Sequence, residues 1–156
     1  MKIAFWSVGK AHESYVKEGI ALYTKRISNY FPVEWTLIPP PKSSTLTEPE
    51  QKQQEAVAIR QLLKDGDYLV ALDERGNAFT SETLSQFLQQ RATASVKRLV
   101  FLIGGAYGID KMVLDAASAR WSLSPLTFPH QLVRLILAEQ IYRACTILRN
   151  EKYHHK

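Results

Sequence analysis

Two short segments, YLVAL at residues 68–72 and LVFLI at residues 99–103, are apolar at every position. A strand is apolar on both faces when helices cover both sides of its sheet, which is typical of parallel sheets. Segments with helical spacing of apolar residues separate these strands along the chain. The sequence therefore predicts an α/β fold with a mainly parallel sheet flanked by helices. We expect one domain over residues 1–156, since no repeat or linker of sufficient length divides the chain.

The remaining elements follow from periodicity and from helix-stopping residues. Further strands are expected over residues 3–8 and 33–38, and the prolines at 39–41 prevent the second from continuing. The polar segment 42–47 predicts a surface loop. Apolar spacing and end signals predict helices over residues 14–29, 48–65, 81–91, 110–119 and 131–149.

The composition limits the location and partners of the chain. A net charge of +5 and a pI near 9.4 favour polyanionic partners such as RNA, although charge alone does not establish them. No apolar run is long enough to cross a bilayer, and the first ten residues lack the apolar core of a signal peptide. The single Cys145 has no second thiol for a disulfide or a metal site. We therefore expect a cytoplasmic protein without membrane attachment and without a bound metal.

The glycine-rich run GGAYG at residues 104–108 follows the second buried strand directly. Glycines at such a strand end allow backbone to approach a ligand closely, because no Cβ intervenes. The run matches neither GxGxxG nor the Walker A sequence, so the two commonest nucleotide motifs are absent. A purely structural turn between strand and helix is the alternative.

The segment WSLSPLTFPH at residues 121–130 is unusually apolar for a loop. Leu123, Leu126 and Phe128 are suited to form the wall of a pocket, while backbone amides and carbonyls of the loop recognise the edge of a base such as adenine. A buried connector without a ligand is the alternative.

The last helix, expected over residues 131–149, has an apolar stripe broader than one core face. Such breadth predicts burial against both its own sheet and a second copy of the chain, and a central helix of a monomer is the alternative. Glu139 and Arg143 are spaced for an ion pair within the helix.

His130 is predicted to be a structural histidine rather than a phosphate contact. The tail residues Tyr153, His154, His155 and Lys156 suit base stacking and phosphate contact, or form a disordered end.

Several segments together resemble one known family. These are IGGAYGID at 103–110, WSLSPLTFPHQLVRLILAEQIYRA at 121–144, EKYHH at 151–155 and the start KIAFWSVGK. They closely resemble the ribosomal RNA large subunit methyltransferase H family, over the whole length of the chain. The resemblance implies a SPOUT-type α/β fold with a C-terminal trefoil knot, an exception to the rule that chains are unknotted. It also implies methylation of N3 of a pseudouridine in 23S ribosomal RNA, and the assembled ribosome is the expected substrate.

The resemblance also implies a cofactor, an oligomer and site residues. S-adenosyl-L-methionine is the implied cofactor, and the implied contacts are Leu72, Gly104, Leu123, Ser124, Pro125, Leu126, Thr127 and Phe128. A homodimer is implied, in which the tail of one subunit helps to complete the other's site. Arg134, Tyr153 and His154 are the candidates for RNA contact, and no catalytic base is assigned. The family's tail lacks the additional His155, which weakens a transfer of roles there. A non-catalytic RNA-binding module and a transfer RNA methyltransferase are the competing interpretations.

Overall fold

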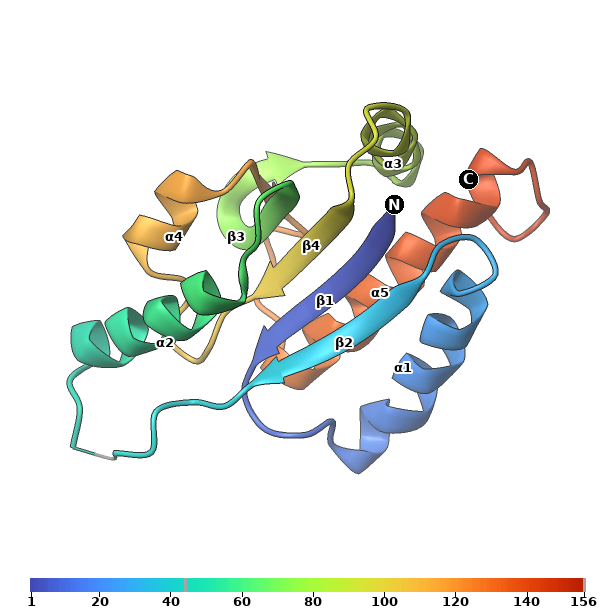
Figure 1. The fold of residues 1–156 in the computed structure, drawn as a ribbon. Coiled ribbons are helices and arrows are strands. Elements are labelled where there is room, and N and C mark those ends of the chain that lie inside the picture. Colours follow the sequence, from blue (N-terminus) through green and yellow to red (C-terminus); the bar gives the residue numbers. More distant parts are fainter. Residues whose placement is uncertain (44, 156) are drawn as a thin grey trace.

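Five parallel strands form one sheet in the order β2-β1-β4-β3-β5 (Figure 1). The computed structural model describes residues 1–43 and 45–155. The predicted α/β fold with a parallel sheet and flanking helices is confirmed. The strands are β1 (Lys2–Val8), β2 (Val33–Ile38), β3 (Asp67–Ala78), β4 (Arg98–Ile103) and β5 (Ala119–Ser122).

In the described residues four helices connect the strands and a fifth follows β5, and side chains cap the starts of α2, α3 and α4. The Thr47 hydroxyl accepts a hydrogen bond from the amide of Glu50, and Thr80 with Thr83 forms a reciprocal capping box. Helix positions agree with the prediction to within a few residues, except in the region after residue 110. The helices are α1 (Ser14–Ile27), α2 (Glu48–Leu62), α3 (Ser81–Thr93), α4 (Lys111–Ala116) and α5 (His130–Leu148).

The prediction of a helix over residues 110–119 is wrong at its C-terminal end. Helix α4 ends at Ala116, and residues 119–122 form the edge strand β5, which the sequence reading missed. This strand has only four residues, and only Trp121 and Ser122 are buried. An edge strand this short lacks the continuous apolar run that revealed β3 and β4. The loop expected from residue 121 therefore begins at Leu123.

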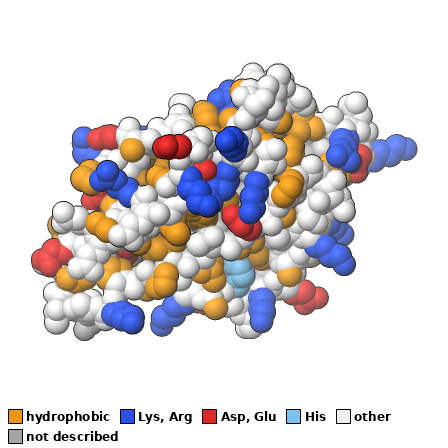
Figure 2. Space-filling view, viewed as in Figure 1, with side chains coloured by type: hydrophobic (Ala, Val, Ile, Leu, Met, Phe, Trp, Pro, Cys, Tyr) orange, Lys and Arg blue, Asp and Glu red, His pale blue; other side chains and the backbone are white. Residues whose placement is uncertain are grey.

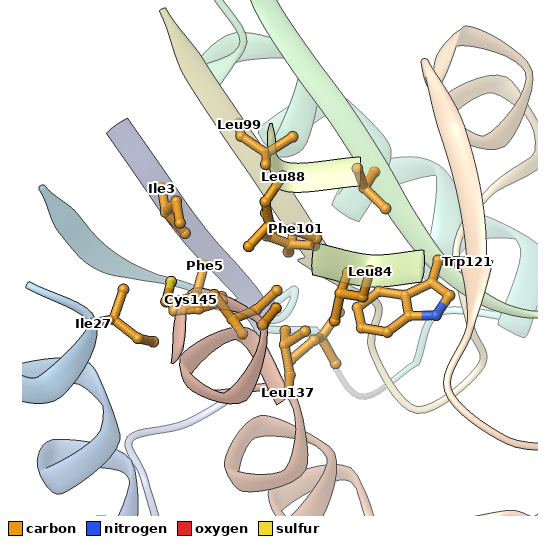
Figure 3. Packing of buried hydrophobic residues seen from close by; sticks show 14 residues of the cluster. Ile3, Phe5, Ile27, Leu84, Leu88, Leu99, Phe101, Trp121, Leu137 and Cys145 are labelled. Carbon is orange, nitrogen blue, oxygen red and sulfur yellow. The ribbon is translucent and has the colours of Figure 1, made fainter. Parts of the chain in front are cut away.

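The continuous apolar strands pack against helices on both faces. In β4, Leu99 and Phe101 face a core shared with α1, α3 and α5, whereas Val100 and Leu102 face a core shared with α2 and α4. Figure 3 shows the first core, where side chains of the sheet meet Leu84, Leu137 and other helix residues. Complete burial of each large side chain contributes roughly 1.5–3 kcal/mol to folding. Both faces of the sheet are thus buried, which explains why apolar and polar residues do not alternate along these strands.

Helix α5 lies against the sheet and between α1 and α3. At Gly19 of α1, an added Cβ would lie 2.8 Å from Leu135 Cδ1, so the two helices approach closely. These intramolecular contacts account for much of the broad apolar stripe, from which burial against both the sheet and a second copy of the chain was predicted. The alternative of a central core helix therefore explains part of that pattern.

The end of β3 differs from a simple strand end. Trp121 of β5 pairs with both Leu72 and Asn77, so residues 73–76 leave the ladder between two pairing positions. A Cβ added to Gly76 would lie 2.6 Å from the carbonyl carbon of Arg120, so the excursion passes close to the backbone of β5. Glycine is required there because any side chain would collide with the β5 backbone. The excursion begins beside the carboxyl end of β5, where Leu72, Asp73 and Glu74 line one cavity with Trp121 and Ser122.

Candidate functional site

A cavity of about 210 Å³ opens at the carboxyl ends of β3, β4 and β5. This is the edge at which parallel α/β sheets bind ligands. The cavity brings together residues from four places: the end of β3, the end of β4 with the glycine-rich turn after it, the end of β5 with the loop after it, and the start of α5. Its lining residues are Leu72, Asp73, Glu74, Ile103, Gly104, Gly105, Gly108, Trp121, Ser122, Leu123, Ser124, Leu126, Thr127, Phe128 and Val133.

The glycine-rich turn is closed by its own backbone. The Gly108 amide donates a hydrogen bond of 3.0 Å to the Gly105 carbonyl, and Gly108 has a positive φ of 86°. A Cβ added to Gly104 would lie 2.6 Å from Ile109 Cγ1 and 2.9 Å from the Gly108 carbonyl carbon. The turn can therefore fold back only because position 104 carries no side chain.

A buried carboxylate lies close to this turn. Glu55 of α2 is only 5% exposed, and a Cβ on Gly105 would lie 2.6 Å from its Oε1 atom. Burial raises the pKa of Glu55, while a hydrogen bond of 3.2 Å from Gln51 Nε2 to its Oε2 acts in the opposite direction. The sequence reading missed Glu55, because a glutamate within a polar helix gives no sign of burial.

The loop between β5 and α5 forms one wall of the cavity. Ser124 Oγ accepts a hydrogen bond of 3.0 Å from the Leu126 amide, and Ser122 Oγ donates one of 3.3 Å to the Ser124 carbonyl. Of the six predicted residues at 123–128, five line the cavity and Pro125 does not. Leu126 is 72% exposed, so its side chain leaves apolar surface at the cavity rim.

A larger polar cavity of about 620 Å³ adjoins the first and shares Leu72, Asp73, Glu74 and Gly108 with it. Charged side chains of both signs line it: Lys52, Asp73, Glu74, Arg75, Lys111, Asp115 and Arg120. Arg120 and Lys111 both pair with Asp115, each at 2.8 Å. Figure 2 shows that on the face it displays, basic side chains stand in several places among acidic ones, rather than in a single stripe.

The tail residues form a polar network on α5 and α3. The Tyr153 hydroxyl donates a hydrogen bond of 3.0 Å to Glu139 Oε1, and Arg143 binds the same carboxylate at 2.6 Å, which confirms the predicted pair within the helix. His154 lies 3.2 Å from Arg143 Nη1 and 3.0 Å from Glu82 Oε1 through its two ring nitrogens. The tail is thus held against the body of the chain up to this point. Lys156 lies outside the described residues.

Arg134 lies apart from the cavity, on the other side of the first turn of α5. Its side chain is completely buried and donates hydrogen bonds to Ser7 Oγ at 2.8 Å and to the Lys10 carbonyl at 2.9 Å. His130 Nε2 lies 2.9 Å from the Val8 carbonyl, and burial lowers the pKa of this histidine. His130 therefore makes the structural contact that the sequence predicted.

Comparison with known proteins identifies the family. A family model described as "Predicted SPOUT methyltransferase" matches residues 1–154. The chain belongs to the SPOUT methyltransferase family. Curated relatives named ribosomal RNA large subunit methyltransferase H share its length. The protein of Cytophaga hutchinsonii is 46% identical over 155 residues, covering 99% of this chain and 100% of its own. That of Parabacteroides distasonis is 47% identical over 157 residues, and both chains are covered completely.

A relative from Acetivibrio thermocellus with the same name is 43% identical over 158 residues, covering 99% of each chain. The family resemblance predicted from residues 103–110, 121–144 and 151–155 is thereby confirmed. No helix in the described part of this SPOUT methyltransferase is long and apolar enough to span a membrane. Among residues 1–43 and 45–155, no group of three or more His, Cys, Asp or Glu side chains is arranged to hold a metal ion.

Proposed function

We propose that this SPOUT methyltransferase uses S-adenosyl-L-methionine to methylate N3 of a pseudouridine in 23S ribosomal RNA, with the assembled ribosome as substrate. We further propose that it works as a homodimer in the cytoplasm and that its C-terminal part forms a trefoil knot. The observation that carries the proposal is the cavity at the carboxyl edge. It contains Leu72, Gly104 and five residues of the 123–128 loop, which are residues that the family resemblance implies for cofactor binding.

The cavity lining fits the adenosine part of such a cofactor. Leu72, Ile103 and Phe128 supply apolar surface for a flat heterocycle, and Ser124 and Thr127 add polar groups beside the loop backbone. The ammonium and carboxylate groups of the cofactor need charged partners. The adjoining polar cavity contains side chains of both signs, and it shares residues 72–74 with the first.

The cofactor supplies a methyl group that is already activated by its sulfonium, so the protein has no need of a covalent nucleophile. The residues of this chain then have to hold the acceptor base in line and exclude water. The closely packed turn at Gly104 and the apolar wall from Leu123 to Phe128 are suited to these tasks. A binding-only RNA module would not need such a cavity, which favours the enzyme over that alternative.

N3 of a pseudouridine carries a proton at neutral pH, so this proton must be lost during methyl transfer. Positive charge near the developing anion would favour that loss. Arg143 and the imidazole of His154 lie in one network with Tyr153 and Glu139. In the proposed dimer, these tail residues of one subunit would face the acceptor base in the partner's site. We assign the network to base contact and charge stabilisation, without naming a general base.

Exposed apolar surface supports the homodimer. Leu126 at the cavity rim is 72% exposed, and Tyr15 and Leu22 of α1 are 60% and 44% exposed. A second copy would cover part of this surface. The excursion of residues 73–76 supports the knot, because it leaves the ladder between β3 and β5 and brings Gly76 against the backbone of Arg120.

Isothermal titration calorimetry with S-adenosyl-L-methionine, followed by labelled methyl transfer to ribosomes from cells lacking the modification, tests the proposal. We expect cofactor binding and incorporation at N3 of one pseudouridine in 23S RNA. Salt-sensitive RNA binding without any cofactor binding would favour the binding-only module. Methylation of transfer RNA but not of ribosomes would favour the transfer RNA enzyme.

The shared site is tested by complementation between two inactive variants. Gly104→Val disrupts the cofactor cavity, and Tyr153→Ala disrupts the tail. If the tail of one subunit completes its partner's site, mixed dimers have one site in which both elements are intact. Activity should return on mixing the two variants after joint refolding. Two inactive variants that stay inactive in verified mixed dimers would contradict a shared site.

A further inference from the structure

The N-termini of α1 and α5 meet at the carboxyl end of β1. The Glu13 amide donates a hydrogen bond of 2.9 Å to Gln131 Oε1, and Gln131 Nε2 donates one of 3.4 Å to the Ala11 carbonyl. Neither helix has a side-chain hydrogen bond from its N-cap residue, Glu13 or Pro129, and neither has an acidic residue in its first turn. The partial positive charges of two helix ends therefore add at one place. Anions bind readily at such ends.

A buried guanidinium lies between these two helix ends. Arg134 is 0% exposed, and its Nη2 atom has no hydrogen-bond acceptor within the described residues. No carboxylate of residues 1–43 and 45–155 forms an ion pair with Arg134; its acceptors are neutral, including Ser7 Oγ and the Lys10 carbonyl. Burial of a cation without a counter-ion and with an unused N–H group is costly. An anion at this place would provide the missing acceptor.

The unused Nη2 group points toward the backbone of Gly9, where a Cβ would lie only 3.0 Å away. Gly9 has a positive φ of 144°, is partly exposed and places no side chain of its own over Nη2, and His130 Nε2 lies 3.8 Å from the position that a Cβ would take. The Lys10 carbonyl and the His12 ring contact Arg134 Nη1, so the loop of residues 9–13 covers the buried guanidinium and has to move aside for a ligand to reach Nη2.

His12 adds a further donor. Arginine only donates, so its contact of 3.1 Å from Nη1 to His12 Nδ1 requires an unprotonated Nδ1 and leaves the proton on Nε2. Burial and the charge of Arg134 lower the pKa of His12, which agrees with a neutral ring in the free protein. Lys17 adds positive charge near His12, while Glu13 is the acidic residue whose charge acts on Arg134.

We propose that one backbone phosphate of the RNA substrate binds where the N-termini of α1 and α5 meet, held by Arg134 Nη2, the first-turn amides and His12. The inference rests on the proposed function, because it assigns the phosphate to that substrate. The position of Arg134 also relates the proposed phosphate contact to the cofactor cavity. Val133 lines the cavity, and the next residue, Arg134, points about 100° away around the helix and contacts Ser7 instead.

The phosphate site is tested first on the unmodified full chain by NMR. Inorganic phosphate is titrated against chloride at constant ionic strength and pH, and the amides of residues 13–15 and 131–132 are followed together with the His12 ring. We expect saturable shifts at these groups. Their absence overturns the proposal without requiring any variant to fold.

Three variants then connect the site to RNA. Arg134→Gln removes the charge, Arg134→Lys retains it, and Lys97→Gln is the control with the same charge change beside the amino end of β4. Loss of one charged contact is expected to raise the KM for ribosomes about tenfold in Arg134→Gln. The slope of log affinity against log salt should fall by about 0.7–0.9. Arg134→Lys should recover part of the affinity, and cofactor affinity should stay unchanged in all three.

The outcomes separate this inference from the proposed function. Phosphate shifts combined with an unchanged KM and salt slope in a folded Arg134→Gln chain would indicate a site for free phosphate only, and would overturn the RNA assignment. If the chain fails to methylate ribosomes at all, the proposed function fails. Sedimentation of each variant with ribosomes then still measures whether Arg134 contributes to RNA binding.

Discussion

Replacement of Gly104 by alanine adds one methyl group at the most crowded point of the glycine-rich turn. The new Cβ would lie 2.6 Å from Ile109 Cγ1, which is about 0.8 Å inside the 3.4 Å where ordinary contact begins. On its other side it would meet the Gly108 carbonyl carbon at 2.9 Å. One neighbour is a side chain and the other is backbone, so the turn itself must move.

The size of the effect follows from this overlap. Overpacking of a well-packed site costs about 1–3 kcal/mol, and this loss should appear in the free energy of unfolding. Gly104 and Gly108 both line the proposed cofactor cavity, so movement of the turn changes the cavity wall. A loss of 1.4 kcal/mol in binding corresponds to about tenfold weaker cofactor affinity. Misplacement of a reacting group by about 1 Å can lower the rate about a hundredfold.

Alanine substitutions at two other glycines distinguish the effect of steric crowding from the effect of backbone strain. Gly108 and Gly66 have positive φ values of 86° and 89°; an added Cβ meets no atom within 4 Å at Gly108 and only Lys97 Cδ, at 3.8 Å, at Gly66. Alanine at either position costs about 1–2 kcal/mol from its left-handed backbone. Gly66 directly precedes β3, at the amino ends of the strands, whereas the cavity lies at their carboxyl ends. Gly66→Ala should therefore lose stability and retain cofactor affinity.

Urea unfolding gives the stability of each variant, and calorimetry gives its cofactor affinity. We expect Gly104→Ala to lose both and Gly66→Ala to lose stability alone. If Gly104→Ala unfolds at a lower urea concentration yet binds the cofactor as tightly as the unmodified chain, the turn is a structural feature only. The assignment of the cofactor to this cavity would then be refuted.

Three further predictions concern other parts of the chain. The Asp67 carboxylate is buried, which opposes ionisation, yet hydrogen bonds from Arg98 hold its pKa below the usual range. Asp67→Asn should therefore lose about 1–3 kcal/mol of stability at pH 7 by urea unfolding, less at pH 3, and the exposed Asp115→Asn should lose little. Burial raises the pKa of Cys145 to about 12, so a thiol reagent at pH 8 should label it only after unfolding. Tyr153→Phe should accelerate amide hydrogen exchange at residues 150–155 without a comparable change in the unfolding midpoint, because only the hydroxyl contact is lost.

The parts of the fold predicted correctly are those in which local pattern and burial agree. YLVAL and LVFLI are apolar throughout because β3 and β4 lie inside the sheet with helices on both faces. Helix α2 could be delimited at its start by Thr47 and the following proline. Edge strand β5 was not predicted, because its sequence ARWS contains a single large apolar residue that is buried. Its pairing also depends on the end of β3, which is distant in the sequence.

The candidate site could likewise be predicted only in part from the sequence. Gly104 and the loop 123–128 could be named from sequence, since glycines and an apolar loop stand out locally. Their meeting in one cavity depends on the strand order, in which β3 lies between β4 and β5. The support from Glu55 and the network of Glu82 with His154 depend on long-range contacts that leave no local pattern. The contact between Glu139 and Arg143 could be predicted, because their spacing within one helix is local.

Helix α5 connects the two proposed binding sites through adjacent residues. Successive residues of a helix point about 100° apart, so Val133 can line the cavity while Arg134 lies under the 9–13 loop. The helix packs against the sheet, α1 and α3, so it cannot turn without disrupting both neighbours. The distance between a phosphate at Arg134 and a cofactor at Val133 is therefore set by one turn of a packed helix. RNA bound at the first site would then have only a limited range of positions from which a base can reach the second.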